Sequence, residues 1–64
     1  MRLYVEPMDA VVVEVDADGK VRLEGEAWTT PSLQECRAIL YAAQNEIAAL
    51  NELVEILERS RRPL

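Results

Sequence analysis

Histidine and phenylalanine are absent from this chain of 64 residues, and cysteine occurs once. One cysteine without any histidine cannot supply the usual zinc ligand sets, and it leaves no partner for an internal disulfide. Cys36 also lacks the histidine base that would activate a thiol nucleophile, so we interpret it as a buried core thiol. We therefore expect no catalytic residue, no metal and no cofactor, and a protein that is not an enzyme.

Long apolar runs are missing as well. No stretch approaches the ~20 apolar residues of a membrane span, and the segment from Met1 to Pro7 lacks the apolar core of a signal peptide. Basic residues are outnumbered, and the formal net charge of −5 argues against a general affinity for nucleic acid or anionic membranes. We expect a cytoplasmic protein that binds neither nucleic acid nor membrane.

Glycine occurs twice and proline three times, and neither interrupts the segment from Ser32 to Arg62. Apolar residues recur there at steps of three and four, the a/d spacing of a coiled-coil seam. The pattern predicts one long amphipathic helix over residues 30–62. We call its seam the a/d stripe, which consists of Leu33, Cys36, Leu40, Ala43, Ile47, Leu50, Val54 and Leu57.

Two start signals compete at the beginning of this helix. Thr30 could be the N-cap, with Pro31 at the first helical position. Ser32 followed by Glu35 three residues later is a rival capping box. Both starts place Glu35 near the positive end of the helix dipole.

The N-terminal half has the alternation of β-strands. A β-branched run from Ala10 to Val15 is followed by Asp16-Ala17-Asp18-Gly19, and residues 20–27 alternate again. A three-residue loop of residues 17–19, with Gly19 left-handed, would set the register of a hairpin. The predicted pairs are Val15–Val21, Val13–Leu23 and Val11–Gly25 on an apolar face, and Glu14–Arg22 and Val12–Glu24 on a polar face.

Residues 2–6 predict a short edge strand that ends in a turn at Pro7. The hairpin register places Trp28 opposite Met8. The fold class is therefore α+β: an antiparallel hairpin or three-stranded meander followed by one long helix. We expect one small domain over residues 1–64, with the sheet in residues 2–28.

A length comparison predicts self-assembly. About thirty helical residues span ~45 Å, whereas a six-residue strand spans ~20 Å. The sheet can therefore cover about half of the helix. A second stripe, defined as Ile39, Ala42, Ala49, Leu53 and Ile56, runs beside the a/d stripe. Two stripes suggest two contacts: the chain's own sheet, and the helix of another copy.

We expect a homodimer, with a tetramer as the open alternative, and the residues that flank the seam carry no complementary charge pattern that would choose between parallel and antiparallel helices. The predicted interface comprises Leu40, Ala43, Ile47, Leu50, Leu53, Val54 and Leu57.

Two further groups could bind something. Arg59, Arg61 and Arg62 could hold an anion or a partner, or they could simply complement the negative end of the helix dipole. Tyr41 falls outside both stripes, so it is the aromatic residue most readily assigned to a partner or ligand.

The acidic residues have ordinary explanations. Glu14, Asp16, Asp18 and Gly19 match the start of an EF-hand loop, but the bidentate glutamate is replaced by Gly25, so we interpret the segment as a turn. Asp9, Glu24 and Glu26 predict a solvated acidic face.

These patterns together favour a small non-catalytic homo-oligomeric interaction protein. It would act as an adaptor, regulator or inhibitor that binds another macromolecule, with a protein as the expected partner. The alternative is a homo-oligomer that sequesters a small molecule or nucleotide in pockets between its subunits.

Overall fold

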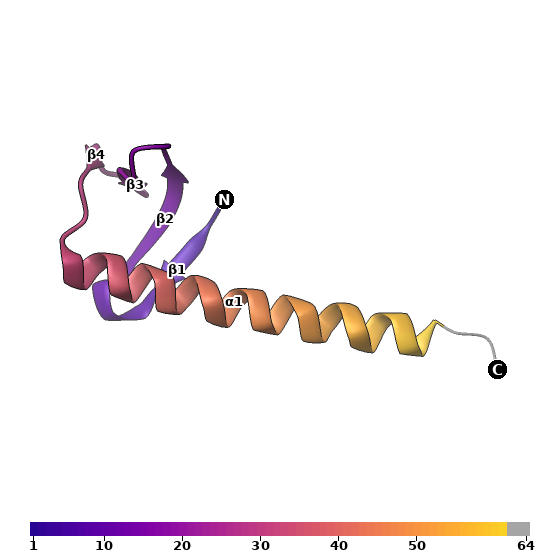
Figure 1. Ribbon diagram of the computed structural model, residues 1–64. Helices are drawn as coiled ribbons and strands as arrows, with labels where there is room; N and C mark the ends of the chain where they lie inside the picture. The colour runs from indigo at the N-terminus through magenta and orange to yellow at the C-terminus, as the bar shows by residue number, and fades with distance from the viewer. Residues whose placement is uncertain (62–64) are drawn as a thin grey trace.

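The computed structural model describes residues 1–61 and shows a four-stranded antiparallel sheet followed by one long helix (Figure 1). The strands are ordered β1-β2-β3-β4 across the sheet. This architecture confirms the predicted α+β class and adds one strand to the meander. In chain order the elements are β1 (Leu3–Val5), the 3-10 helix η1 (Glu6–Met8), β2 (Ala10–Val15), β3 (Val21–Leu23), β4 (Trp28–Thr29) and α1 (Leu33–Ser60).

The turn predicted at Pro7 is present as η1. The backbone N–H of Asp9 donates to the Glu6 carbonyl at 3.0 Å, and Asp9 itself is left-handed with φ 47°. Proline suits the start of this turn because its ring already fixes the φ angle that the turn requires. The turn reverses the chain so that β1 pairs with β2.

The loop between β2 and β3 also follows its sequence. Gly19 has φ 85°, and the Asp16 N–H donates to the Lys20 carbonyl at 3.0 Å. The Asp16 side chain accepts from the backbone N–H groups of Asp18 and Lys20, both at 2.9 Å. These hydrogen bonds explain the Asp16 carboxylate as a turn-forming group. Strands and not helices flank the loop, as the interpretation of this segment as a turn expected.

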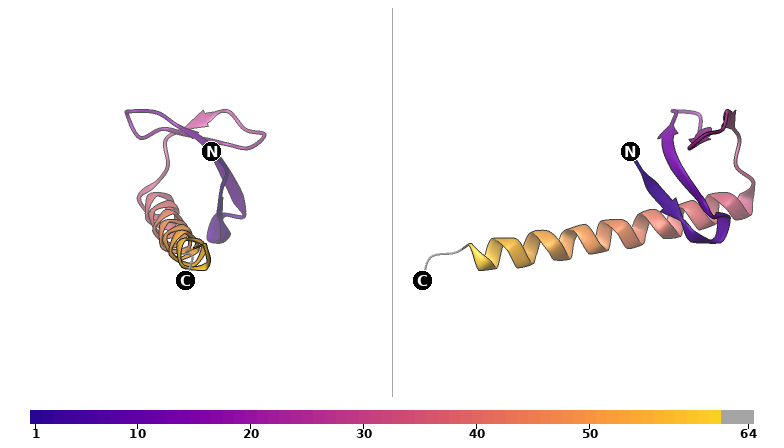
Figure 2. Two further views of the ribbon diagram at one scale, coloured as in Figure 1. Left: turned by 90° about the vertical axis from the view of Figure 1, so that its right-hand side faces the viewer. Right: turned by 180° about the vertical axis from the view of Figure 1, so that it is seen from behind.

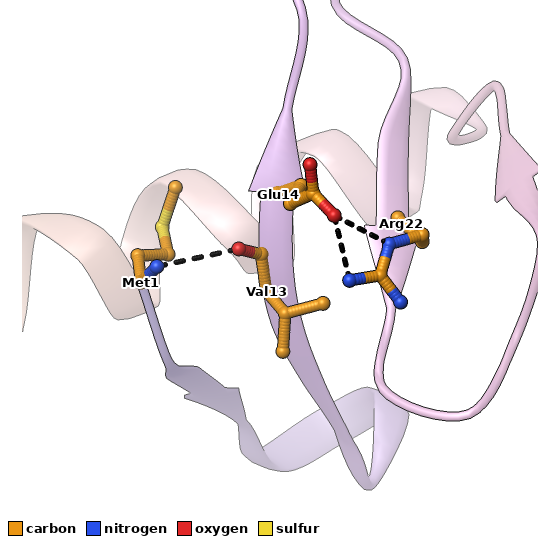
Figure 3. Close-up of polar contacts among 4 residues, drawn as sticks. All are labelled: Met1, Val13, Glu14 and Arg22. Atoms are coloured by element: carbon orange, nitrogen blue, oxygen red, sulfur yellow. Dashed lines mark hydrogen bonds and ion pairs between the residues drawn. The ribbon is translucent and has the colours of Figure 1, made fainter.

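The predicted register holds at the loop end of the β2–β3 pair. Val15 lies opposite Val21, and Glu14 lies opposite Arg22. Figure 3 shows the resulting ion pair, in which Glu14 Oε1 accepts from Arg22 Nε at 2.7 Å and lies 2.6 Å from Nη2. Glu14 is exposed, so we expect this pair to contribute less than ~1 kcal/mol.

Beyond Glu14 the predicted register is wrong. A bulge at Val13 shifts the pairing, so Val12 lies opposite Leu23 instead of Glu24. The shift moves Val12 from the polar face into the core, where it is 2% exposed. The Val13 carbonyl instead accepts from the amino group of Met1 at 3.3 Å (Figure 3). Burying a valine that would otherwise lie among charged residues is the physical reason for the bulge.

The strand predicted over residues 20–27 is also too long. β3 ends at Leu23, and the chain turns there, with the Glu26 N–H donating to the Leu23 carbonyl at 3.0 Å. Gly25 occupies the third turn position with φ 78°, as a type II turn requires. The returning strand β4 places Trp28 opposite Arg22, so the predicted Trp28–Met8 pairing is wrong.

Helix α1 begins at Leu33 with Ser32 as its N-cap. The Glu35 N–H donates to Ser32 Oγ at 3.1 Å, and the Ser32 N–H donates to Glu35 Oε1 at 2.7 Å. The capping-box alternative is therefore confirmed and the Thr30 start is wrong. The helix ends at Ser60, and the predicted final residue, Arg62, lies outside the described residues.

The core is small and lies at one end of the helix. Among residues 1–61, the buried side chains are Val5, Val12, Val21 and Leu23. Ala38, Ile39 and Ala42 of α1 pack against this cluster, together with Leu3, Met8 and Ala10. Every residue from Gln44 to Ser60 is exposed, and Figure 2 shows this part of the helix extending well beyond the sheet.

Candidate functional site: the uncovered face of the helix

The sheet packs on only one of the two apolar stripes of α1. Ile39 and Ala42 of the second stripe, with the neighbouring Ala38, lie against the core. The helix contacts chiefly β1 and η1, which cross it near its N-terminal end (Figure 1). The second stripe is therefore used by the chain's own sheet, as the two-stripe interpretation expected for one of its contacts.

The a/d stripe, by contrast, keeps its six large side chains exposed. Its large side chains are between 50% and 68% exposed, and Cys36 and Ala43 are half-buried. The stripe extends over 24 helical steps, or ~36 Å. Its large exposed members are Leu33, Leu40, Ile47, Leu50, Val54 and Leu57.

The exposed area is large for a chain of this size. The protein has 5385 Å² of accessible surface, whereas a compact monomer of 7.2 kDa exposes about 4,100 Å². The excess of about 1,300 Å² is more than the ~800 Å² that one partner contributes to a standard protein interface. The radius of gyration, 15.2 Å, also exceeds the ~11 Å of a compact chain of this length.

The predicted interface residues divide between the two stripes. Six of the seven lie on the a/d stripe, whereas Leu53 lies on the second stripe beyond the end of the sheet. Leu53 is 49% exposed and Ile56 is 46% exposed. The C-terminal half of α1 therefore carries two uncovered apolar edges side by side. Sequence reasoning identified both stripes but could not say which one the sheet would occupy.

The proposed anion or partner residues lie far apart within one chain. Tyr41 and Arg59 are separated by 18 helical residues, or ~27 Å along α1. Arg59 lies in the last turn and Arg61 at the C-cap, where both complement the negative end of the helix dipole. Arg62 lies outside the described residues. Tyr41 and the arginines thus do not form a single site in the monomer.

Tyr41 instead lines a surface hollow of about 520 Å³ between η1 and α1. Tyr4, Glu6 and Pro7 line it from the side of β1 and η1, and Glu46 is among the residues that line it from α1. Sequence reasoning did not connect Tyr4 with Tyr41, because only the packing of β1 on the helix brings them together.

Tyr4 is held in place by a hydrogen bond to Asp9. Its hydroxyl donates to Asp9 Oδ1 at 3.2 Å. This hydrogen bond raises the pKa of Tyr4 above its ordinary value of 10.0, and the negative charge of Asp9 adds to the effect. Both favour the protonated phenol, because a phenolate would lose its bond and lie beside a carboxylate.

The predicted acidic face is divided by the fold. Arg2 forms an ion pair with Glu24, whereas Asp9 and Glu26 line a second hollow of about 530 Å³ beside Glu35. Within residues 1–61, no group of three or more potential metal-ligating side chains is gathered closely enough to hold an ion. These carboxylates give the sheet end of the molecule an acidic surface.

Cys36 is a free thiol on the a/d stripe. It is half-buried in the single chain, less than the fully buried core thiol that the sequence suggested. The stripe around it is apolar, so it belongs to the packing surface.

Neither a membrane-spanning segment nor a known relative indicates a function for the described residues. Over residues 1–61 we find no helix with the length and apolar character needed to cross a bilayer. Searches against protein-family models, curated proteins and solved structures each found no match. Functional inference therefore depends on the surface of the molecule itself.

Proposed function

We propose that this chain is a small non-catalytic interaction protein that assembles with itself through the a/d stripe of α1. The observation that carries the proposal is the contrast between the two stripes: the sheet packs on the second stripe and leaves the six large side chains of the a/d stripe exposed, from Leu33 to Leu57. Burying each large apolar side chain of this stripe is worth about 1.5–3 kcal/mol. A second copy offers the same stripe.

The chain's size supports the same conclusion. Domains near 60 residues bury little apolar surface and commonly need a disulfide, a metal or a partner subunit. Here the single cysteine is free, and only four buried side chains form the core of the described residues. Self-association supplies the missing burial. We propose the role of adaptor, regulator or inhibitor that binds another macromolecule.

Leu50→Asp tests self-association. Leu50 lies near the middle of the uncovered part of the stripe, and a carboxylate there would be buried without a partner. We expect sedimentation equilibrium to show that this substitution weakens dimerisation at least about 100-fold, or about 2.7 kcal/mol. Trp28 fluorescence reports whether the sheet of the variant stays folded.

Asn51→Asp is the matched control. It introduces the same side chain one residue away, on the polar face of the helix, and should leave the dimer constant within about twofold. A wild-type chain that sediments as a monomer at micromolar concentrations would overturn the proposal. So would an L50D variant that dimerises as well as N51D.

The hollow between η1 and α1 favours small-molecule binding as a second candidate. Its two tyrosines and two carboxylates suit an organic cation, which aromatic faces and acidic groups both attract. They do not suit the phosphates of a nucleotide, and the hollow lies within one chain instead of between subunits. A native mass spectrum of the purified protein would reveal a bound cation as an adduct, and Tyr41→Ala should remove it.

A further inference from the structure

Resting on the self-association proposed above, we infer that the second copy lies antiparallel, with α1 against α1 and the twofold axis level with residue 45. This level is midway between Leu33 and Leu57, so it is the one alignment that overlaps the complete a/d stripes of both copies. Three features of the chain favour this orientation over a parallel pair: side-chain size, the second apolar edge and the distribution of charge.

Side-chain size favours antiparallel layers. In a parallel pair in register, each a/d residue faces its own copy, so Ala43 would face Ala43 and leave a thin layer in the seam. In the antiparallel pair each layer combines one a and one d residue, and the small residues face larger ones. The four layers are Leu33 with Leu57, Cys36 with Val54, Leu40 with Leu50, and Ala43 with Ile47.

The second apolar edge also requires a cover. Leu53 and Ile56 continue the stripe on which the sheet packs, but they lie beyond the sheet and are nearly half exposed. In an antiparallel pair, the twofold axis places the C-terminal half of one helix beside the N-terminal half of the other. The sheet of that other copy then lies on the same side as Leu53 and Ile56 and can cover them. In a parallel pair the two C-terminal halves project together, away from both sheets, and this edge stays in water.

The distribution of charge along the chain also favours the antiparallel pair. Residues 1–46, which include the sheet, carry nine acidic and four basic residues, whereas residues 47–64 carry three of each. Arg59 and Arg61 lie at the far end of α1. The antiparallel pair brings these two cations of one copy to the acidic sheet end of the other, and it opposes the two helix dipoles. A parallel pair would place the two acidic ends together and the two arginine ends together.

The single native cysteine makes a direct test available. In the proposed pair, Cys36 faces Val54 of the other copy, and the two Cys36 thiols are 18 helical steps, or ~27 Å, apart. Val54→Cys should therefore allow two symmetric disulfides between residues 36 and 54. Each forms as two thiols are oxidised and oxidised glutathione is reduced to two molecules of glutathione. A short bis-maleimide serves as a second reagent for thiols that lie too far apart for a direct bond.

We expect V54C to run almost entirely as a covalent dimer on a non-reducing gel, with peptide mapping that joins residue 36 to residue 54. The wild type, whose only thiol is Cys36, should stay uncrosslinked. The control C36A/V54C, whose only thiol is at residue 54, should also stay uncrosslinked. Sedimentation under reducing conditions establishes beforehand that each variant still dimerises.

The outcomes separate this inference from the proposed function. Crosslinking of the wild type through Cys36 and of C36A/V54C through residue 54 would show a parallel pair and overturn the orientation, while self-association would stand. A dimer in solution that gives no link between residues 36 and 54 with either reagent would overturn the proposed alignment. A protein that sediments as a monomer would overturn the proposed function itself.

Discussion

The Tyr4 hydroxyl donates a hydrogen bond to Asp9 Oδ1 at 3.2 Å. The bond joins β1 to the left-handed residue that follows η1, so it spans the tight turn that packs against α1. It also fixes the ring that forms one wall of the hollow shared with Tyr41. The stability of the turn is therefore coupled to the protonation of an exposed phenol.

The coupling predicts a loss of stability at high pH. The folded pKa of Tyr4 is raised above its ordinary value of 10.0, so its hydrogen bond stabilises the fold below pH 10 and is lost as the pH rises through the folded pKa. We expect the free energy of unfolding to fall more steeply above pH 10 in the wild type than in Tyr4→Phe.

Absorbance of tyrosinate near 295 nm measures the same shift directly. In a Tyr41→Phe background only Tyr4 titrates, and Asp9→Asn should lower its pKa because the charge of the acceptor is removed. An unchanged titration after D9N would contradict the assignment of the shift to Asp9.

The N-terminal cap of α1 gives a prediction that separates the two start signals. Ser32→Ala removes the side-chain acceptor of the Glu35 N–H, and we expect it to lower the free energy of unfolding by about 1 kcal/mol. Thr30→Ala removes a residue that makes no cap, and its effect should lie within about 0.5 kcal/mol. Urea unfolding followed by circular dichroism at one protein concentration measures both, and equal losses would contradict the observed cap.

The turn after β3 depends on backbone freedom at Gly25. A Cβ there meets no atom within 4 Å among the described residues, so any cost of Gly25→Ala arises from φ 78° and not from crowding. We expect a loss of about 1–2 kcal/mol. Gly25→Asn should cost less, because asparagine tolerates the left-handed region. If the Gly25→Ala and Gly25→Asn variants unfold at the same urea concentration as the wild type, the left-handed conformation of Gly25 in this turn is contradicted.

Self-association predicts that thermal stability depends on concentration. For a dimer of this length, a tenfold increase in protein should raise the melting temperature by about 5 °C, because only the folded dimer gains from mass action. L50D should show a weaker dependence of its melting temperature on concentration than the wild type. Melting temperatures of the wild type measured over about two decades of protein concentration test this expectation. A constant melting temperature would contradict the dimer.

Local features were predictable because neighbouring residues decide them. Asp16 and Gly19 made the hairpin loop, Pro7 made the turn after β1, and the absence of glycine and proline between Ser32 and Arg62 allowed one long helix. In each case the preferred φ, the side-chain hydrogen bond or the apolar period is a property of a few adjacent residues. The same period predicted both apolar stripes of the helix.

Tertiary packing decided the rest. The sequence could not place the bulge at Val13, because the reason for it is the burial of Val12 opposite Leu23, a residue eleven positions away. Nor could it say which stripe the sheet would cover, since both are apolar and the choice depends on how β1 and η1 cross the helix. The periodicity by itself determined that two apolar faces exist. Only the packed structure decided that the second stripe is occupied within the chain and that the a/d stripe remains exposed, because the short sheet has room for one of them.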